Sequence, residues 1–109
     1  MGWLLREEEV LAALEVAASW RSRSRGLLGR DRLEGALLLP RTRSVHTVGM
    51  RFPIDVAFCD RDMVVLRTVT VRPNRVTRPS VRARYVVEAE AGAFERWRLR
   101  PGDKLEVKE

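Results

Sequence analysis

The residues best suited to chemistry are concentrated in one stretch, which runs from Ser44 to Asp60. It contains His46, the single histidine of the sequence, and Asp55, an aspartate that follows a proline and an isoleucine. An imidazole in such a stretch can serve as a general base, a proton relay or an anion contact. It can equally be a half-buried ring that is hydrogen-bonded to a carbonyl or carboxylate. Because the sequence offers no second histidine to work with it, the structural interpretation of His46 is favoured.

The backbone around these residues is constrained by Gly49 and Pro53, four positions apart. Glycine permits a positive φ or a close approach by another chain segment. Pro53 fixes its own φ and drives Phe52 toward an extended conformation. A helix is therefore not expected here. The alternation that follows Pro53 predicts a strand, Ile54–Cys59, with one face made of aliphatic and aromatic side chains.

Asp55 falls on the face of this strand that lies opposite the apolar row. There we expect its carboxylate to meet His46 or an arginine rather than water. An aspartate at a strand entrance after proline also commonly caps a turn or pairs with arginine. Both structural and functional roles are therefore open for Asp55.

Other strands and helices must position the Ser44–Asp60 stretch, and hydrophobic patterns predict most of these elements. A hairpin is expected across the polar turn Asp60–Asp62, and a type II turn is expected at Arg100–Asp103. The segment Val10–Ala18 fits either a helix or a strand by pattern alone. Ser19 is a good N-cap for a helix over Trp20–Leu28, and Gly29 a good stop. The other expected elements are strands at Trp3–Arg6, Gly35–Pro40, Met63–Val71, Tyr85–Glu90 and Leu105–Val107, and a short helix at Ala93–Leu99.

One long segment, Arg72–Arg84, lacks a regular pattern and contains five arginines and no acidic residue. It is too long to be a simple connection, which is typical of functional loops. A loop of this charge is where we expect an anionic ligand or partner to bind. The competing interpretation is a solvated excursion with no ligand.

Composition sets broad limits on the fold and its partners. The chain has 109 residues, of which 45% are hydrophobic and 33% charged, enough for one domain with a modest core. The net charge is +6, and all but two of the 21 basic residues are arginines. Such a preference for arginine over lysine can reflect genome base composition. Charge alone therefore does not predict a nucleic-acid partner.

The single cysteine, Cys59, excludes an intramolecular disulfide and gives no structural zinc site. We expect no metal and no cofactor. The first residues have no basic region and no long apolar run, so they are not typical of a secretory signal, and no stretch is long enough to span a membrane. These features predict a cytoplasmic protein.

Several short motifs in order resemble the DUF192 family, also called UPF0127. They are Arg25–Arg30, Gly35–Leu38, Phe52–Asp60, Val87–Gly92 and Gly102–Asp103. The resemblance implies one domain over residues 1–109, mainly β and compact, of a sandwich or barrel-like kind, with a helix after the first strands and a short C-terminal helix. On that basis Val10–Val16 is expected to be a strand paired with Trp3–Arg6. Many family members carry Trp-Met-x-Asn-Thr where this chain has His46–Met50, and the family has no settled activity.

The first functional hypothesis is a non-catalytic binding module for a small anionic or polyhydroxylated, sugar-like ligand near His46 and Asp55. Arginine and histidine would supply donors, and carboxylates would orient them. The candidate ligand-binding residues are Arg25, His46, Thr47, Met50, Arg51, Asp55 and Glu88.

Two alternatives stay open. The first is a hydrolase-type enzyme in which His46 is the base and Asp55 or Glu88 orients it or acts as a general acid. The second is arginine-mediated binding of nucleic acid or of a protein partner. Nucleic acid is not favoured, because the basic residues are not interleaved with aromatic ones. The oligomeric state is not predicted.

Overall fold

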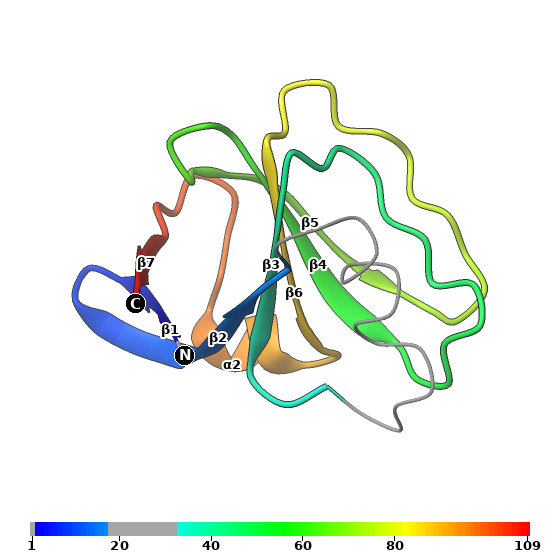
Figure 1. Ribbon diagram of the computed structural model, residues 1–109, viewed down its shortest axis with the longest axis horizontal. Coiled ribbons are helices and arrows are strands. Elements are labelled where there is room, and N and C mark those ends of the chain that lie inside the picture. Colours follow the sequence, from blue (N-terminus) through cyan, green and yellow to red (C-terminus); the bar gives the residue numbers. More distant parts are fainter. Residues whose placement is uncertain (1, 18–32) are drawn as a thin grey trace.

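Seven strands and one short helix make up the part of the chain that the computed structural model describes, residues 2–17 and 33–109 (Figure 1). The strands form one sheet in the order β5-β4-β6-β3-β2-β1-β7. The mainly β class predicted from sequence is confirmed. The strands are β1 (Gly2–Arg6), β2 (Glu9–Val16), β3 (Ala36–Pro40), β4 (Ile54–Cys59), β5 (Val65–Val71), β6 (Tyr85–Glu90) and β7 (Glu106–Lys108), and the helix is α2 (Ala93–Trp97).

The pairing confirms that the N-terminal segment is split into two strands. β1 and β2 form an antiparallel hairpin, and β2 then lies parallel to β3. The alanine content of Val10–Ala18 favoured a helix in this segment. Pairing on both sides of β2 outweighs that preference. The helix predicted over Trp20–Leu28 lies outside the described residues.

The hairpin of β4 and β5 is also confirmed, although β5 begins at Val65 rather than at Met63. Met63 has a φ of 63°, which removes it from the strand. The carboxylate of Asp60 accepts hydrogen bonds from the main-chain N–H groups of Asp62 at 2.9 Å and Val64 at 3.0 Å. This arrangement holds the expected polar turn and delays the strand by two residues.

The sheet buries side chains on both faces. On one face, which we call the helix face, Ala57 and Cys59 of β4 lie in a cluster with Phe94 of α2 and Leu99. Phe94 also packs on Trp97, with ring centroids 5.5 Å apart. The other face, which we call the loop face, carries Ile54, Val56 and Phe58 of β4, covered by residues from the loops that flank the sheet.

The end of α2 is fixed by contacts from β1. The helix stops at Trp97, two residues earlier than predicted, because Arg98 takes a left-handed φ of 54°. Arg6 donates hydrogen bonds to the carbonyl oxygen of Trp97 at 2.6 Å and to the carboxylate of Asp103 at 3.1 Å. The turn at Arg100–Asp103 closes as predicted, with Gly102 at a φ of 97° and the N–H of Asp103 donating to the carbonyl of Arg100.

Two long irregular segments, residues 41–53 and 72–84, lie side by side and are called the loop pair (Figure 1). Main-chain hydrogen bonds join them, including Thr47 N–H to the Arg75 carbonyl at 2.8 Å and Thr77 N–H to the Val45 carbonyl at 2.8 Å. The loop pair contains eight arginines and no acidic residue, which exceeds the net charge of +6 of the whole chain. Among the described residues, the loop pair is therefore a strongly cationic part of the protein.

Candidate functional site

Asp55 is buried, with 4% of its surface exposed, and its carboxylate is fully engaged by the protein. One oxygen accepts a hydrogen bond from the Thr70 hydroxyl at 2.7 Å. The other accepts from the main-chain N–H groups of Gly92 at 3.0 Å and Phe94 at 3.1 Å. The expected contact of Asp55 with His46 or an arginine is therefore wrong. Instead, the residue ties three elements together.

The contacts of Asp55 explain how α2 begins. Gly92, at the N-cap position, has no side chain with which to cap the helix, and its φ of 96° suits glycine. The first N–H groups of a helix have no partner within the helix itself. Asp55 supplies the missing acceptor from β4, so strand and helix are held together by one carboxylate.

Glu88 is also buried, at 4% exposed, but it lies on the other side of the sheet. In the pairing of β4 with β6, Asp55 is opposite Ala89 and Glu88 is opposite Val56. Because successive strand residues point to opposite faces, Asp55 belongs to the helix face and Glu88 to the loop face. The two carboxylates therefore cannot both take part in one site with His46.

His46 is exposed, and the half-buried imidazole favoured from sequence is wrong. Its main chain forms an isolated antiparallel bridge with Val76. Within residues 2–17 and 33–109 its ring has no hydrogen-bond partner. The residue therefore lies on the surface of the loop pair.

Thr47 is completely buried and organises the loop pair. Its hydroxyl donates to the Arg72 carbonyl at 2.5 Å and accepts from the Arg75 N–H at 3.0 Å. Its carbonyl accepts from the N–H of Asn74 at 2.9 Å. These bonds set the path of the arginine-rich loop, so Thr47 positions cationic residues.

The other predicted residues are scattered. Met50 is buried in the cluster of the loop face, which makes it a core residue. Arg51 is exposed on the loop pair. Arg25 lies outside the described residues. The seven candidates therefore do not converge on one cavity in the part of the chain that the structure describes.

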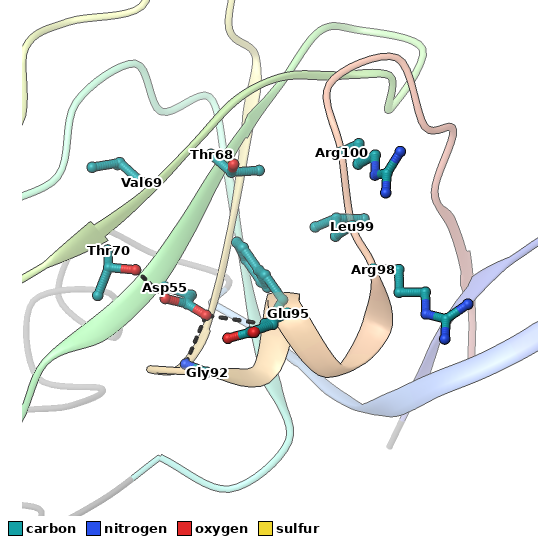
Figure 2. Close-up of a pocket in the computed structure, with 10 residues that line it drawn as sticks. Asp55, Thr68, Val69, Thr70, Gly92, Glu95, Arg98, Leu99 and Arg100 are labelled. Carbon is teal, nitrogen blue, oxygen red and sulfur yellow. Dashed lines mark hydrogen bonds between the residues drawn. The ribbon is translucent and has the colours of Figure 1, made fainter.

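A hollow of about 620 Å³ lies beside Asp55 and is called the Asp55 hollow (Figure 2). Its walls come from β5, from α2 and from the residues that follow the helix. Its charges balance, with two carboxylates and two arginines, and in Figure 2 the guanidinium groups of Arg98 and Arg100 point away from Asp55. The lining residues are Asp55, Thr68, Val69, Thr70, Gly92, Phe94, Glu95, Arg98, Leu99 and Arg100.

A second hollow, of about 420 Å³, lies between β5 and the loop pair and is called the arginine hollow. Four arginines line it without any acidic residue. Three valines give it an apolar wall, of which Val69 is 36% and Val76 is 70% exposed. The lining residues are Arg67, Val69, Thr70, Val71, Arg72, Arg75, Val76, Thr77 and Arg78.

Arg67 is the most constrained of these arginines. Its guanidinium carbon lies 4.4 Å from the centroid of the Phe58 ring, and one terminal nitrogen donates to the Arg78 carbonyl at 2.7 Å. Its Nε is buried and has no hydrogen-bond partner among the described residues. Burial lowers the pKa of the Arg67 guanidinium, and the positive charge of Arg78 lowers it further.

Sequence reasoning missed Arg67, Thr68 and Glu95 as lining residues. Arg67 had a visible signal, because it interrupts an otherwise aliphatic row, Val65, Val69 and Val71, on one face of a strand. A charged side chain in a buried apolar row is rare unless a specific contact stabilises it, so Arg67 could have been singled out. Glu95 gave no comparable signal in a short amphipathic helix.

The part of the chain that the structure describes contains neither a candidate metal site nor a membrane-spanning helix. No group of three or more His, Cys, Asp or Glu side chains there is arranged to hold a metal ion. No helix in the same residues is long and apolar enough to cross a membrane.

Fold and site together define a small, mainly β domain with a hollow on each side of an edge strand. Residues 4–107 match the model of the DUF192 family, which is described as an uncharacterised ACR. The chain belongs to this family.

Relatives of similar length support the assignment. The UPF0127 protein PH1112 of Pyrococcus horikoshii is 34% identical over 97 residues, which cover 84% of each chain. The UPF0127 protein PYRAB11210 of Pyrococcus abyssi is 30% identical over 114 residues, covering 97% of each.

Two solved structures share the fold. A protein of unknown function from Novosphingobium aromaticivorans superposes with a TM-score of 0.78 at 19% identity, over 96% of this chain and 82% of that one. A candidate transcription regulator from Sinorhizobium meliloti superposes with a TM-score of 0.77 at 23% identity, over 97% and 91%. At these identities the likeness is one of fold.

Proposed function

We propose that this chain is a non-catalytic binding module for a small organic anion, which it holds in the arginine hollow. The observation that carries the proposal is the set of four arginines that line this hollow with no carboxylate among them. Elsewhere, Arg6 and Arg96 form ion pairs with acidic residues. Unpaired arginines gathered around one cavity form a ready site for an anion.

The side chains that line the arginine hollow limit the class of ligand that it can bind. A guanidinium group presents a planar fork of donors that matches a carboxylate or a phosphate. The valines add an apolar surface that a bare inorganic ion would not use. A volume of about 420 Å³ falls within the range of small-molecule sites, roughly 300–1000 Å³. A carboxylate or phosphate attached to a short apolar body fits these properties best.

The proposed anion site is the arginine hollow and not the Asp55 hollow. The carboxylate of Asp55 already accepts three hydrogen bonds, and Glu95 adds a second negative charge to the same hollow. Both would repel an anion. The Asp55 hollow instead supports a second candidate, binding of a neutral polyhydroxylated molecule, because the Thr68 hydroxyl and the exposed Glu95 carboxylate offer one donor and several acceptors.

Calorimetric titration with hexanoate, a carboxylate on an aliphatic chain, tests the proposal. We expect Arg75→Ala and Arg78→Ala each to weaken binding by about tenfold, as for the loss of one charge-assisted hydrogen bond. Arg61→Ala is the matched control, since Arg61 is an exposed arginine that lines neither hollow. Equal losses in all three variants would contradict the proposal. Glucose and inositol titrated into the Glu95→Gln variant test the second candidate.

Salt dependence separates the anion pocket from nucleic-acid binding by the same arginines. Binding that follows phosphate contacts along a strand falls steeply as salt rises, because several counterions are released. Binding of one small anion in a hollow depends much less on salt. Titration of a single-stranded oligonucleotide and of hexanoate at two salt concentrations distinguishes the two.

A further inference from the structure

β5 is the last strand on its side of the sheet, and most of its outer edge is open. It pairs with β4 on one side. On the other side, main-chain bonds occur at Val65, which donates to the Asp103 carbonyl at 2.8 Å and accepts from the Gly102 N–H at 2.7 Å. From Arg67 to Val71, no main-chain hydrogen bond reaches any other described segment outside β4. Such an edge is a template for another extended chain.

The two hollows flank this open edge. Val69 and Thr70 line both of them. Arg67, Val69 and Val71 share the loop face with the β4 residues opposite them, whereas Thr68 and Thr70 share the helix face with Ala57 and Asp55. A chain added to β5 would therefore alternate its side chains between a cationic hollow and a hollow that contains two carboxylates.

We propose that the open edge of β5 binds an extended acidic peptide by strand addition. Alternate acidic residues of the peptide enter the arginine hollow, and uncharged residues between them face the Asp55 hollow. This inference rests on the proposed function, since it identifies the anion as a peptide carboxylate. The valines of the arginine hollow contact the methylene groups of the acidic side chains.

Charge selects the partner as well as binding it. An edge strand is often protected by charged residues that repel further strands. Here a second copy of β5 would bring a second cationic lining against the first arginine hollow, so pairing between two copies is opposed. An acidic peptide meets no such penalty, and its carboxylates neutralise arginines that have no acidic partner among the described residues.

The test uses three synthetic peptides of equal length, titrated into the whole chain by fluorescence anisotropy. One alternates glutamate with threonine. The second has the same composition with the glutamates in one block. The third is the alternating sequence with N-methyl groups on the amides that would pair with β5. We expect the alternating peptide to bind at least about tenfold tighter than either of the others, because only it keeps both the charge register and the main-chain bonds.

Two further measurements fix the location. Bound alternating peptide should slow hydrogen exchange of amides between Arg67 and Val71, and Arg75→Ala should weaken it about tenfold while Arg61→Ala does not. Equal affinity for the alternating, blocked and N-methylated peptides overturns strand addition, and so does binding of an oligonucleotide with no binding of peptide. If hexanoate still binds in those cases, the anion-binding proposal survives. If neither hexanoate nor any peptide binds, both proposals fail.

Discussion

The two hollows beside β5 share a strand but use charge in opposite ways. In the Asp55 hollow the buried carboxylate accepts three hydrogen bonds from the protein itself, and the lining contains two carboxylates and two arginines. In the arginine hollow four arginines line the wall, with no acidic residue among the described lining residues. The hydrogen bonds of Asp55 give this buried carboxylate a structural role, in joining β4, β5 and α2. The unpaired charges are the better guide to a ligand.

The two hollows differ because successive side chains of β5 point to opposite faces of the sheet. Thr70 points toward Asp55, while its neighbours Val69 and Val71 point toward the loop pair. A shift of one residue in the pairing of β4 and β5 would exchange the two sets. The register of this hairpin therefore decides which hollow receives Arg67.

The largest effect is expected for Asp55→Ala. The substitution leaves the N–H groups of Gly92 and Phe94 and the hydroxyl of Thr70 without their acceptor, so we expect a loss of about 3 kcal/mol in the free energy of unfolding. Urea denaturation measures it. Glu95→Ala is the control, because that exposed residue lines the same hollow and should change stability by less than about 0.5 kcal/mol. A small loss for Asp55→Ala would mean that its carboxylate is not structural, and the contrast between the hollows would disappear.

A second prediction concerns Cys59, which shares the helix face of β4 with Asp55. Burial raises the pKa of the Cys59 thiol to about 12, and the nearby charge of Asp60 adds to the shift. The folded state therefore keeps the thiol protonated where the unfolded chain, with a pKa near ~8.5, ionises. The stabilisation is complete below about pH 8.5 and is lost progressively as pH rises toward 12.

Between pH 9 and pH 11 this amounts to about 2–3 kcal/mol for the parent protein. Thermal denaturation of the parent and of Cys59→Ala across this range measures the difference in slope, which is independent of any cavity that the variant leaves. Parallel curves would show that Cys59 is accessible to water, and that the helix face is less dry than its packing implies.

Thr47→Val tests the loop pair. Removal of the hydroxyl leaves the Arg75 N–H and the Arg72 carbonyl unpaired in a buried position, so we expect a loss of about 1–2 kcal/mol in unfolding free energy. Hexanoate affinity should fall as well, since Thr47 sets the path of the arginine loop. Lost stability with unchanged affinity would show that the arginine hollow does not depend on this anchor.

The smallest effect is expected for His46→Ala. The ring is exposed, so the unfolding free energy should change by less than about 0.5 kcal/mol. Thermal denaturation at several pH values provides the test. A loss above ~1 kcal/mol would instead indicate a hydrogen-bonded structural histidine and would return this residue to the interpretation that sequence favoured.

Local patterns in the sequence predicted most of the strands because their cause is local. The alternation in β4 and β6 reflects packing on a pleated surface, and both strands occur at the predicted residues. The turn at Arg100–Asp103 follows from proline and glycine at fixed places. The start of β5 was misplaced because the Asp60 carboxylate extends the turn, a contact that propensity does not encode.

The site was less predictable because it depends on contacts between distant residues. Asp55 meets N–H groups that lie 37 and 39 positions later in the chain, and no periodicity reveals that. Asp55 and Glu88 lie on opposite faces only because of the register between β4 and β6. The arginine loop, by contrast, was marked by composition alone, since five arginines without an acid are visible in the sequence.

The pairing of β1 with β7 has a consequence for how the protein forms. Trp3, Leu4 and Leu5 lie opposite Lys108, Val107 and Glu106, so one of the first strands made is completed by the last. The hairpin of β1 and β2 can form early, but the second edge of β1 stays open until β7, about a hundred residues later in the chain, reaches it. Closure over so long a separation is slow, and the open edge is exposed to aggregation meanwhile. The pairing of β1 with β7 is therefore expected to be a late step in the folding of this sheet.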